Sequence, residues 1–559
     1  MRAPIVFALV FLAIAGCGSD STPPPGADSG HLPGVDGGPI PGHDSGPPVD
    51  GGPITPPSAT CTAPITPVDT THADHVVSDC TEAGLRAAVA MGGTITFSCT
   101  GATTITVTAP IAVPTDRDTT IDGGGHVTLD GGGTSQILSF NHPDYRMSHH
   151  VLTLQHLTLQ HGHVNGTMMY DASAPAPCSH GYLDGFGGAV LVRDGTLHVF
   201  DCTFLDNQAA SLGPDVGGGA ISLNGALGAV VVGSTFRGNR ASNGPAIQSL
   251  NSDLDVYDST FENNVAEGNG ANGDDATMCH VVAATGQHQT GSGGNGGAIS
   301  IDGGSDVMHT FCGTTFRGNQ GGIGALGGAI FRTPDGAMQT TIIDRCTFDA
   351  NTSDSGGALY FHNSTLQIHA TTFHANVANK GCGALQADGT QFDLVNDTFS
   401  DNVATAGLGG AICMFGNGGT IAFTTFADNH ADGGDPYFAA AIAGGTALTL
   451  TSDLFANNTA RNQGAAMQCM STTSTGEGDL QWPRNHVVGS APDSLCTPTV
   501  MFADPMLGAI GNHGGPTPTR LPAAGSPAIG HGVSCPATDQ RGMPRPSTGC
   551  TSGAVEGAI

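Results

Sequence analysis

Hydrophobic and polar residues alternate along most of the chain in short stretches that turn residues separate. In Leu197-His198-Val199, the two aliphatic side chains point to one side of an extended strand and the histidine points to the other. Turn residues such as Asp194-Gly195 precede these stretches. Because the same region shows no helical periodicity, the pattern predicts short strands joined by tight turns.

The strands belong to an internal repeat whose most regular element is Phe-x-x-Asn. Nine copies are present, and Thr precedes Phe in eight of them. The pairs are Phe204/Asn207, Phe236/Asn239, Phe261/Asn264, Phe316/Asn319, Phe348/Asn351, Phe373/Asn376, Phe399/Asn402, Phe426/Asn429 and Phe455/Asn458. The successive Phe spacings are 32, 25, 55, 32, 25, 26, 27 and 29 residues, which is typical of a solenoid with one coil per repeat.

A second element, Gly-Gly-Ala followed by an aliphatic residue, lies between the Phe units. It occurs at 187–190, 218–221, 296–299, 327–330, 356–359 and 409–412, with degenerate copies at 382–385 and 464–467. The 55-residue spacing holds one coil and an insertion at about 265–294. We therefore predict an all-β fold over residues 61–500, a parallel β-helix whose coils stack about 4.8 Å apart.

Each repeated residue has a physical role in such a coil. Stacked Phe rings fill the interior, and glycines allow the tight bend into the next strand. Asn at the turn is expected to adopt an unusual backbone conformation and to bond its own backbone, and stacked copies are expected to form an amide ladder. Cys202 and Cys346 each precede a Phe by two residues and are expected to be small buried groups on its inward side.

An N-terminal cap is expected because an open coil exposes unpaired backbone groups. Asp79 and Glu82 have the spacing of a helix capping pair. We predict a short helix over 82–90, with Leu85 and Val89 on one face, followed by a first strand over 94–97.

Composition excludes several classes of protein. The 16 basic and 47 acidic residues give a net charge of −31, so nucleic acid is a poor partner. There are 86 glycines, and Glu and Lys, which helical bundles favour, are nearly absent.

The N-terminus indicates export and membrane tethering. Residues 1–16 have the short apolar core of a signal peptide, and Ile14-Ala15-Gly16-Cys17 resembles a bacterial lipobox, which implies lipidation of Cys17. An ordinary signal peptide with an incidental Cys is the alternative. Residues 17–60 are rich in Pro, Gly and Asp and are expected to form an extended tether.

An exported chain is free to form disulfides. Of the 15 cysteines, the pairs closest in sequence are the candidates: Cys80 with Cys99, Cys469 with Cys496, and Cys535 with Cys550.

Three segments resemble known families. The paired Gly-Gly-Ala-Ile and Phe-x-x-Asn elements at 187–467 resemble the chlamydial polymorphic outer membrane protein repeat. Residues 119–133, with Thr-Thr-Ile-Asp-Gly-Gly-Gly, resemble an early coil of pectate-lyase-like β-helices, which implies a right-handed parallel β-helix. The C-terminal module, 501–559, is similar to a choice-of-anchor module, with Asp504-Pro505-Met506-Leu507 and 514–519 (Gly-Gly-Pro-Thr-Pro-Thr) among its matching residues. These resemblances imply a protein of the bacterial envelope, at the outer membrane or cell surface, and no particular reaction.

Catalysis has to be judged from residues, because β-helices also include polysaccharide lyases and hydrolases. Asn251-Ser252-Asp253 with Asp274-Asp275 is faintly similar to polygalacturonase motifs, but Asn251 has the repeat register of an ordinary turn. Most Asp residues occur in Asp-Gly and Asp-Asn turns, which need no metal. Ca²⁺ is compatible with this composition, but the sequence places no site for it.

A histidine cluster is the other chemical feature. It consists of His149, His150, His156, His161 and His163, of which two or three could meet at a metal. Solvent-facing histidines on an exported surface are the simpler interpretation. With Leu152, Leu154, Leu157 and Leu159 in the core, His156 is expected to face outward, and His161 and His163 to flank a turn at Gly162.

Two functions remain open. The first is a non-catalytic, lipid-anchored adhesin, binding or structural module that holds extracellular glycans or other envelope components. The second is a polysaccharide lyase or glycoside hydrolase on the same scaffold. A groove with Asp, Arg and His gathered from neighbouring coils would favour the second function, and scattered turn Asp residues without a cleft would favour the first.

Overall fold

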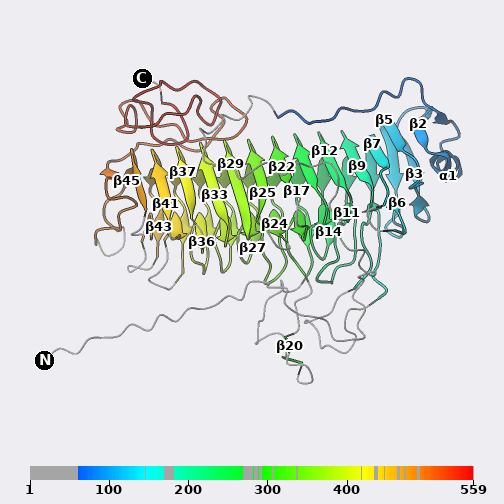
Figure 1. Ribbon diagram of the computed structural model, residues 1–559, viewed down its shortest axis with the longest axis horizontal. Helices are drawn as coiled ribbons and strands as arrows, with labels where there is room; N and C mark the ends of the chain where they lie inside the picture. Colours follow the sequence, from blue (N-terminus) through cyan, green and yellow to red (C-terminus); the bar gives the residue numbers. More distant parts are fainter. Residues whose placement is uncertain are drawn as a thin grey trace.

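The structure is a computed structural model that describes residues 61–144, 147–168, 182–268, 281–282, 287–288, 293–304, 308–334, 338–416, 418–433, 439–445, 447–461, 466–470, 474–486 and 491–557. Cys17, the tether and most of the insertion, including Asp274 and Asp275, lie outside these ranges. The described chain is a parallel β-helix, an elongated rod of stacked coils (Figure 1).

Three columns of parallel strands run along the rod, and most coils contribute a strand to each. We call the first the β9 column, and the second, which carries the Phe residues, the β10 column. The β9 column contains β1 (His75–Val77), β2 (Gly93–Phe97), β5 (Thr119–Asp130), β7 (Val151–Gln160), β9 (Thr196–Phe200), β12 (Gly228–Val232), β16 (Leu254–Tyr257), β22 (His309–Cys312), β25 (Gln339–Asp344), β29 (Ser364–His369), β33 (Gln391–Val395), β37 (Gly419–Ala422), β41 (Leu448–Thr451) and β44 (Thr475–Glu477). The β10 column contains β3 (Thr103–Thr106), the second halves of β5 and β7, β10 (Thr203–Leu205), β13 (Thr235–Arg237), β17 (Thr260–Glu262), β23 (Thr315–Arg317), β26 (Thr347–Asp349), β30 (Thr372–His374), β34 (Thr398–Ser400), β38 (Thr425–Ala427), β42 (Leu454–Ala456), β45 (Leu480–Trp482) and β46 (Met501–Phe502).

The third column is a separate sheet of eleven strands. It contains β4 (Ile111–Ala112), β6 (Leu138–Asn141), β8 (Val190–Arg193), β11 (Ile221–Asn224), β15 (Ile247–Leu250), β21 (Ile299–Asp302), β24 (Ile330–Thr333), β28 (Leu359–His362), β32 (Leu385–Asp388), β36 (Ile412–Phe415) and β40 (Ile442–Gly444). Two-residue parallel strands come directly after some strands of the β10 column along the chain. They are β14 (Arg240–Ala241), β18 (Val265–Ala266), β27 (Thr352–Ser353), β31 (Val377–Ala378), β35 (Val403–Ala404), β39 (His430–Ala431) and β43 (Thr459–Ala460). Within the insertion, β19 (Val281–Val282) and β20 (Gln287–His288) pair antiparallel.

The predicted interior is confirmed. All nine repeat Phe residues are fully buried. Neighbouring rings stack with their centroids 4.5 to 5.2 Å apart and their planes within 14° of parallel. Since Phe261 pairs directly with Phe316, the 55-residue spacing is one coil with an insertion, and Val265 still belongs to the regular coil.

The amide ladder is also confirmed, but the expected bond of each Asn to its own backbone is wrong. Asn319 Nδ2 donates to Phe261 O (2.9 Å) and to Asn351 Oδ1 (2.9 Å), so its side chain bonds the coils on either side. The left-handed conformation is adopted by the residue before the ladder Asn, as in Asp206 (φ 51°) and Asp428 (φ 56°). The corner residue therefore makes the bend, and the buried Asn ties the coils together.

The two glycines of Gly-Gly-Ala have different roles. The first adopts a positive φ in five of the six exact copies, as in Gly327 (φ 74°). At the second, Gly328, any Cβ would collide with the carbonyl oxygen of Gly357 in the next coil. One glycine therefore permits the bend and the other permits close approach of two backbones.

A second column of short buried side chains lies at the corner between the β9 and β10 columns. Several accept a backbone N–H of the preceding coil; examples are Ser234 Oγ from Cys202 N (3.1 Å) and Asp453 Oδ1 from Thr424 N (2.7 Å). Cys202 and Cys346 occupy this corner, buried as predicted and not in disulfides. Burial raises the pKa of the Cys202 thiol to about 12, so it is a structural, unreactive group.

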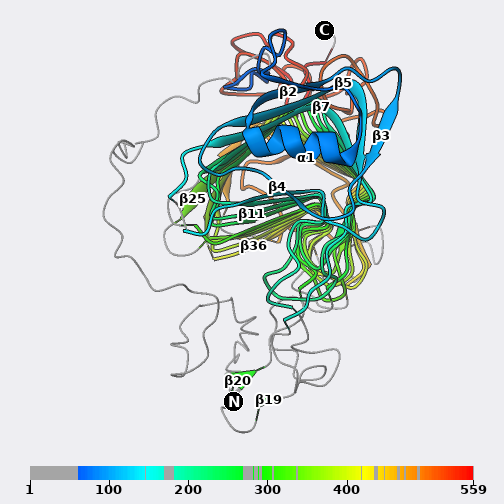
Figure 2. The same cartoon turned by 90° about the vertical axis from the view of Figure 1, so that its right-hand side faces the viewer.

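The N-terminal helix is present as α1 (Glu82–Met91), with Leu85 and Val89 buried beneath it. It lies across the end of the rod and covers the first coil (Figure 2). The predicted Asp79 cap is wrong, because Thr81 is the N-cap and its hydroxyl accepts the N–H of Gly84 (3.1 Å). Asp79 accepts the Thr81 hydroxyl instead (2.8 Å), and β1 precedes the strand that was expected to be first.

Two non-repeating segments run along one side of the rod (Figure 1). The strap, residues 61–74, lies over the α1 half. The C-terminal segment, residues 503–557, folds back over the other half after β46. Together they cover parts of the β9 and β10 columns and leave a section of the β10 column open.

Candidate binding face

The outer surface of the β10 column carries an unbroken row of threonines. Each precedes an inward-facing core residue and therefore points outward. The row consists of Thr104, Thr128, Thr158, Thr203, Thr235, Thr260, Thr315, Thr347, Thr372, Thr398 and Thr425, in direct register from coil to coil. We call it the Thr column.

The first eight members of the Thr column, Thr104 to Thr347, are exposed or partly exposed. The last three are buried beneath the C-terminal segment. Thr372 Oγ1 donates to Pro518 O (2.5 Å), and Thr398 Oγ1 donates to Gln540 Oε1 (2.6 Å). Eight hydroxyls at a coil spacing of about 4.8 Å form an open polar face on the order of 35 Å long.

A row of charged residues runs beside part of the Thr column. Each of them comes two residues after the Thr of its strand. Arg317 lies between Glu262 (Nη1–Oε1 3.7 Å) and Asp349 (Nε–Oδ2 3.0 Å). His374 Nδ1 contacts the other Asp349 oxygen at 2.8 Å. Opposite charges on adjacent coils balance each other here, in a chain whose net charge is −31.

The same row connects the open face to the C-terminal segment. His374 Nε2 lies 3.9 Å from Asp401 Oδ2, and Arg520 contacts Asp401 (2.8 Å) and Asp428 (2.7 Å). The hydrogen bond from His374 and the bond from Arg317 lower the pKa of Asp349. The hydrogen bond to Asp349 raises the pKa of His374.

A cavity lies towards each end of the open face. One, of about 440 Å³, is lined by Asp130, His161, His163, Asp206 and Gln208 together with neighbouring glycines. The other, of about 230 Å³, lies where Thr315, Arg317 and Thr347 meet the C-terminal residues 512–518. The open face is therefore hollowed towards both of its ends.

The structure separates the predicted histidine cluster into individual contacts. Three imidazoles each face a carboxylate of the preceding coil: His150 with Asp118 (3.1 Å), His156 with Asp122 (3.0 Å) and His161 with Asp130 (3.2 Å). His163 contacts Asn165, and His149 is exposed. His156 faces outward as expected, with Leu152, Leu154, Leu157 and Leu159 in the core.

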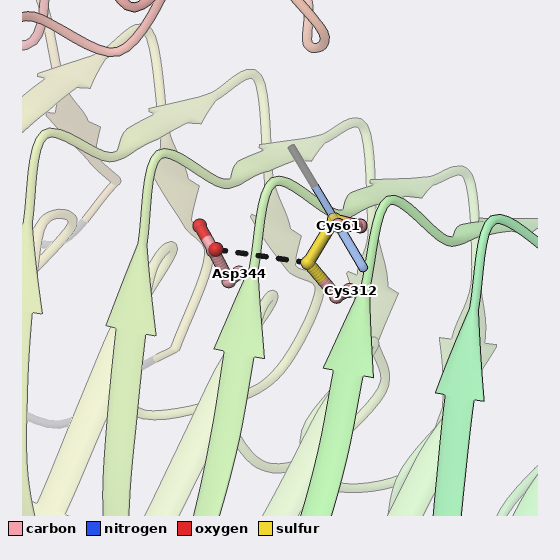
Figure 3. A group of neighbouring side chains, drawn as sticks. All are labelled: Cys61, Cys312 and Asp344. Atoms are coloured by element: carbon pink, nitrogen blue, oxygen red, sulfur yellow. Dashed lines mark hydrogen bonds between the residues drawn. A yellow bond between two sulfur atoms is a disulfide. The ribbon is translucent and has the colours of Figure 1, made fainter. Parts of the chain in front are cut away.

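Among the described residues, one group of three metal-ligating side chains comes close together, and it contains none of these histidines. It consists of Cys61, Cys312 and Asp344 (Figure 3). Cys61 and Cys312 form a disulfide, so neither sulfur is a thiolate that could bind a metal. The group is a covalent clamp with a carboxylate beside it.

That disulfide fixes one end of the strap. Val68 and Gln155 exchange two hydrogen bonds of 3.0 Å, and Thr70 Oγ1 donates to Asp122 Oδ2 (2.6 Å). The outward-facing Phe200 and Tyr257 lie between Gln155 and Cys312 in one register column, and both are buried. The strap thus covers an apolar stripe of the β9 column.

Four further disulfides occur within the described residues. Cys80–Cys99, Cys469–Cys496 and Cys535–Cys550 are the pairs expected from sequence proximity, and Cys382–Cys413 was not anticipated. This number of disulfides indicates an exported protein.

A second polar group lies on the β9 column between the strap and the C-terminal segment. Asp344 pairs with Arg345 (2.5 Å), His369 lies beside Asp344 in register, and its Nε2 lies 3.9 Å from Asp393 Oδ2. Burial raises the pKa of Asp344, whereas the nearby imidazole of His369 and the hydrogen bond from Thr420 outweigh burial and lower the pKa of Asp393. Neither cavity includes these residues. Asn251, which was weighed as part of a hydrolase motif, lies in an ordinary turn, as its position in the repeat predicted (φ 50°).

The sequence contained a signal for the Thr column that its interpretation missed. Thr precedes Phe in eight repeats, and alternation places it outward, so the row follows once the copies are aligned. Thr104, Thr128 and Thr158 precede Ile or Leu instead, and only the strand register reveals that they belong to it. Alignment of the repeats would also have placed Asp344 beside His369, because each lies four residues before a repeat Phe.

No helix among the described residues is both long and apolar enough to cross a bilayer. No protein-family model, curated protein or solved structure matches this chain.

Proposed function

We propose that this protein is a non-catalytic surface module that binds an extended, uncharged polysaccharide along the open Thr column. The observation that carries the proposal is the register of eight solvent-reaching Thr hydroxyls, one per coil. A polymer with hydroxyl groups at regular intervals can exchange hydrogen bonds with such a row. Beside Thr260, Thr315 and Thr347 the flanking charges are already paired, so this part of the face favours a neutral ligand over a charged one.

Membrane tethering is the second part of the proposal. The lipobox-like residues before Cys17 and the Pro-rich tether support a lipid anchor in the bacterial envelope, at the outer membrane or cell surface. The repeat and choice-of-anchor resemblances support the same location.

The clamp determines how a tether would hold the rod. Cys61 is bonded to Cys312 in β22, which is the eighth of the fourteen strands of the β9 column. A tether that ends at Cys61 therefore meets the rod at its middle. The rod would then be presented sideways, with its long face towards the surroundings, and would not stand upright as a stalk.

Polysaccharide hydrolysis is the second candidate function, and the Asp344–Arg345–His369–Asp393 group favours it. The group gathers Asp, Arg and His from neighbouring coils, and its two carboxyls have pKa values shifted in opposite directions, as an acid and a base require. Against cleavage, the side chains of Asp344 and Arg345 are only 10% and 9% exposed, and each is the other's ion-pair partner.

One experiment separates the two functions. The exported chain, carrying Cys17→Ser to keep it in solution, is incubated with mixed-linkage β-glucan, glucomannan, galactan and pullulan, with and without Ca²⁺. Retention on a polysaccharide without new reducing ends supports binding. Product release that disappears in Asp344→Asn and Asp393→Asn would establish the enzyme instead. Neither retention nor products with any of the four would overturn both proposals.

A further inference from the structure

Within the described residues, the open Thr column is closed at one end only. Thr104 at the α1 end is exposed. At the other end the next coil after Thr347 carries Thr372, which is fully buried and donates to Pro518 O. Thr517 Oγ1 also donates to Ala370 O (3.0 Å), so the C-terminal segment is bonded directly across the path of the row.

A cavity of about 230 Å³ lies at this closed end. Its floor consists of Thr315, Arg317 and Thr347, the last part of the open face, and its wall consists of residues 512–518 of the C-terminal segment. Pockets for drug-sized ligands typically measure about 300–1,000 Å³. A smaller cavity at the end of a linear face suits one terminal unit of a polymer.

The groups in the cavity indicate a neutral unit. Thr315 and Thr347 supply hydroxyls, and Asn512 is an exposed residue whose amide can both donate and accept. The one cation, Arg317, already pairs with Glu262 and Asp349. A carboxylate on the ligand would compete with these two acidic side chains, whereas a hydroxyl would not.

We infer that the protein recognises an end of a neutral polysaccharide chain: the polymer lies along the Thr column and its terminal sugar occupies the cavity against residues 512–518. This inference rests on the proposed function. It adds that the blocked coil at Thr372 prevents the polymer from continuing in the direction of the row, so an internal segment of a long chain cannot fill the cavity.

Binding stoichiometry tests the inference. The whole exported chain with Cys17→Ser is titrated with short and long preparations of whichever of the four polysaccharides retains it. End recognition predicts one protein per polysaccharide chain at both lengths. A number of bound proteins that rises in proportion to length would overturn the inference and leave the proposed function intact. Failure to bind any of the four would overturn both.

A variant locates the terminal unit. Asn512→Trp places a bulky side chain at the cavity from an exposed position, and we expect it to weaken binding of a short oligosaccharide at least tenfold. The matched control is Gln391→Trp, an exposed residue of the β9 column outside the face, with affinity expected to be unchanged. Wild-type affinity in Asn512→Trp, with its thermal unfolding unchanged, would also overturn the inference.

Discussion

Thr372 donates its hydroxyl proton to the carbonyl oxygen of Pro518 across 146 residues of sequence. The same hydroxyl accepts from Gln540 Nε2 (2.8 Å). A threonine that would otherwise extend the open polar row is thereby bonded within an intramolecular interface. This contact sets where the open face ends and where the C-terminal segment begins to cover the rod.

Gln540 is the residue on which this interface depends most. It is buried, its Nε2 bonds Thr371 O (3.3 Å) and Thr517 Oγ1 (3.0 Å) as well as Thr372, and its Oε1 accepts from Thr398. Gln540→Ala leaves several of these groups unpaired, and we expect it to weaken docking of the segment by about 2–4 kcal/mol. Trypsin should then cut faster after Arg520 and Arg541. An unchanged cleavage rate, equal to that of the exposed control Gln391→Ala, would contradict the prediction.

The Asn ladder should dominate the stability of the middle coils. Asn319→Ala removes the acceptor for both Asn264 N (3.1 Å) and Asn264 Nδ2 (2.9 Å), and both donors are buried. At about 1–3 kcal/mol for each unpaired donor, we expect a loss of about 3–5 kcal/mol, measured by urea unfolding. Asn263→Gly is the control, because Asn263 is exposed at φ 53° and glycine adopts this conformation without strain. Equal effects of the two substitutions would show that the ladder contributes little.

The His374–Asp349 contact should make stability depend on pH. The pKa of His374 is raised from 6.5, so its contribution is full below pH 6.5 and is lost as the pH rises through the folded-state value. The pKa of Asp349 is lowered from 3.8, so its contribution is present above pH 3.8 and is lost as the pH falls through the folded-state value. Asp401 adds to the attraction on His374, and Arg520 opposes it.

We therefore expect His374→Gln to lower the unfolding midpoint at pH 5.5 and to have a smaller effect at pH 8.5. The control is His149→Gln, an exposed histidine before β7. A loss of stability that is the same at both pH values would show that the imidazole contributes by packing and not by charge.

Removing the ionisable group of Asp479 should stabilise the protein, whereas removing that of His374 should destabilise it. It is buried at the corner between columns, where burial raises its pKa from 3.8 to about 6. Its favourable contribution to the free energy of unfolding is full below pH 3.8 and is lost as the pH rises through about 6. The wild type is therefore less stable at neutral pH than it would be with an uncharged group at this position. Asp479→Asn keeps an acceptor for Asp453 N and should stabilise the protein at pH 7.5 by up to about 3 kcal/mol, with little gain at pH 4.

Thermal unfolding at the two pH values measures this difference, with Asp206→Asn at an exposed corner as the control. A variant less stable than wild type at pH 7.5 would mean that the ionised carboxylate is favourable at this position.

The sequence predicted the core of the repeat and several features that are local in sequence, such as α1 and three disulfides, but it missed contacts between distant, unique segments. Period and alternation were sufficient for the coil, the Phe stack and the ladder, because each copy contacts the same position in the next. They could not pair Cys61 with Cys312 or place Gln540 against Thr372, since these contacts join unique segments to the rod. The capping error was local: Asp79 and Glu82 have the right spacing, but Thr81 is the residue whose hydroxyl reaches the first turn.

The most direct test of the central claim is the affinity of a Thr column variant for the retained polysaccharide. Thr235→Val and Thr260→Val together keep the shape of two adjacent, outward-facing residues and remove only their hydroxyls. Thr365→Val, at a partly exposed position of β29 in the β9 column, is the matched control. We predict that the double variant folds normally and binds at least tenfold more weakly, whereas Thr365→Val binds as the wild type does. Wild-type affinity in the double variant would contradict the claim that the open Thr column is the binding face.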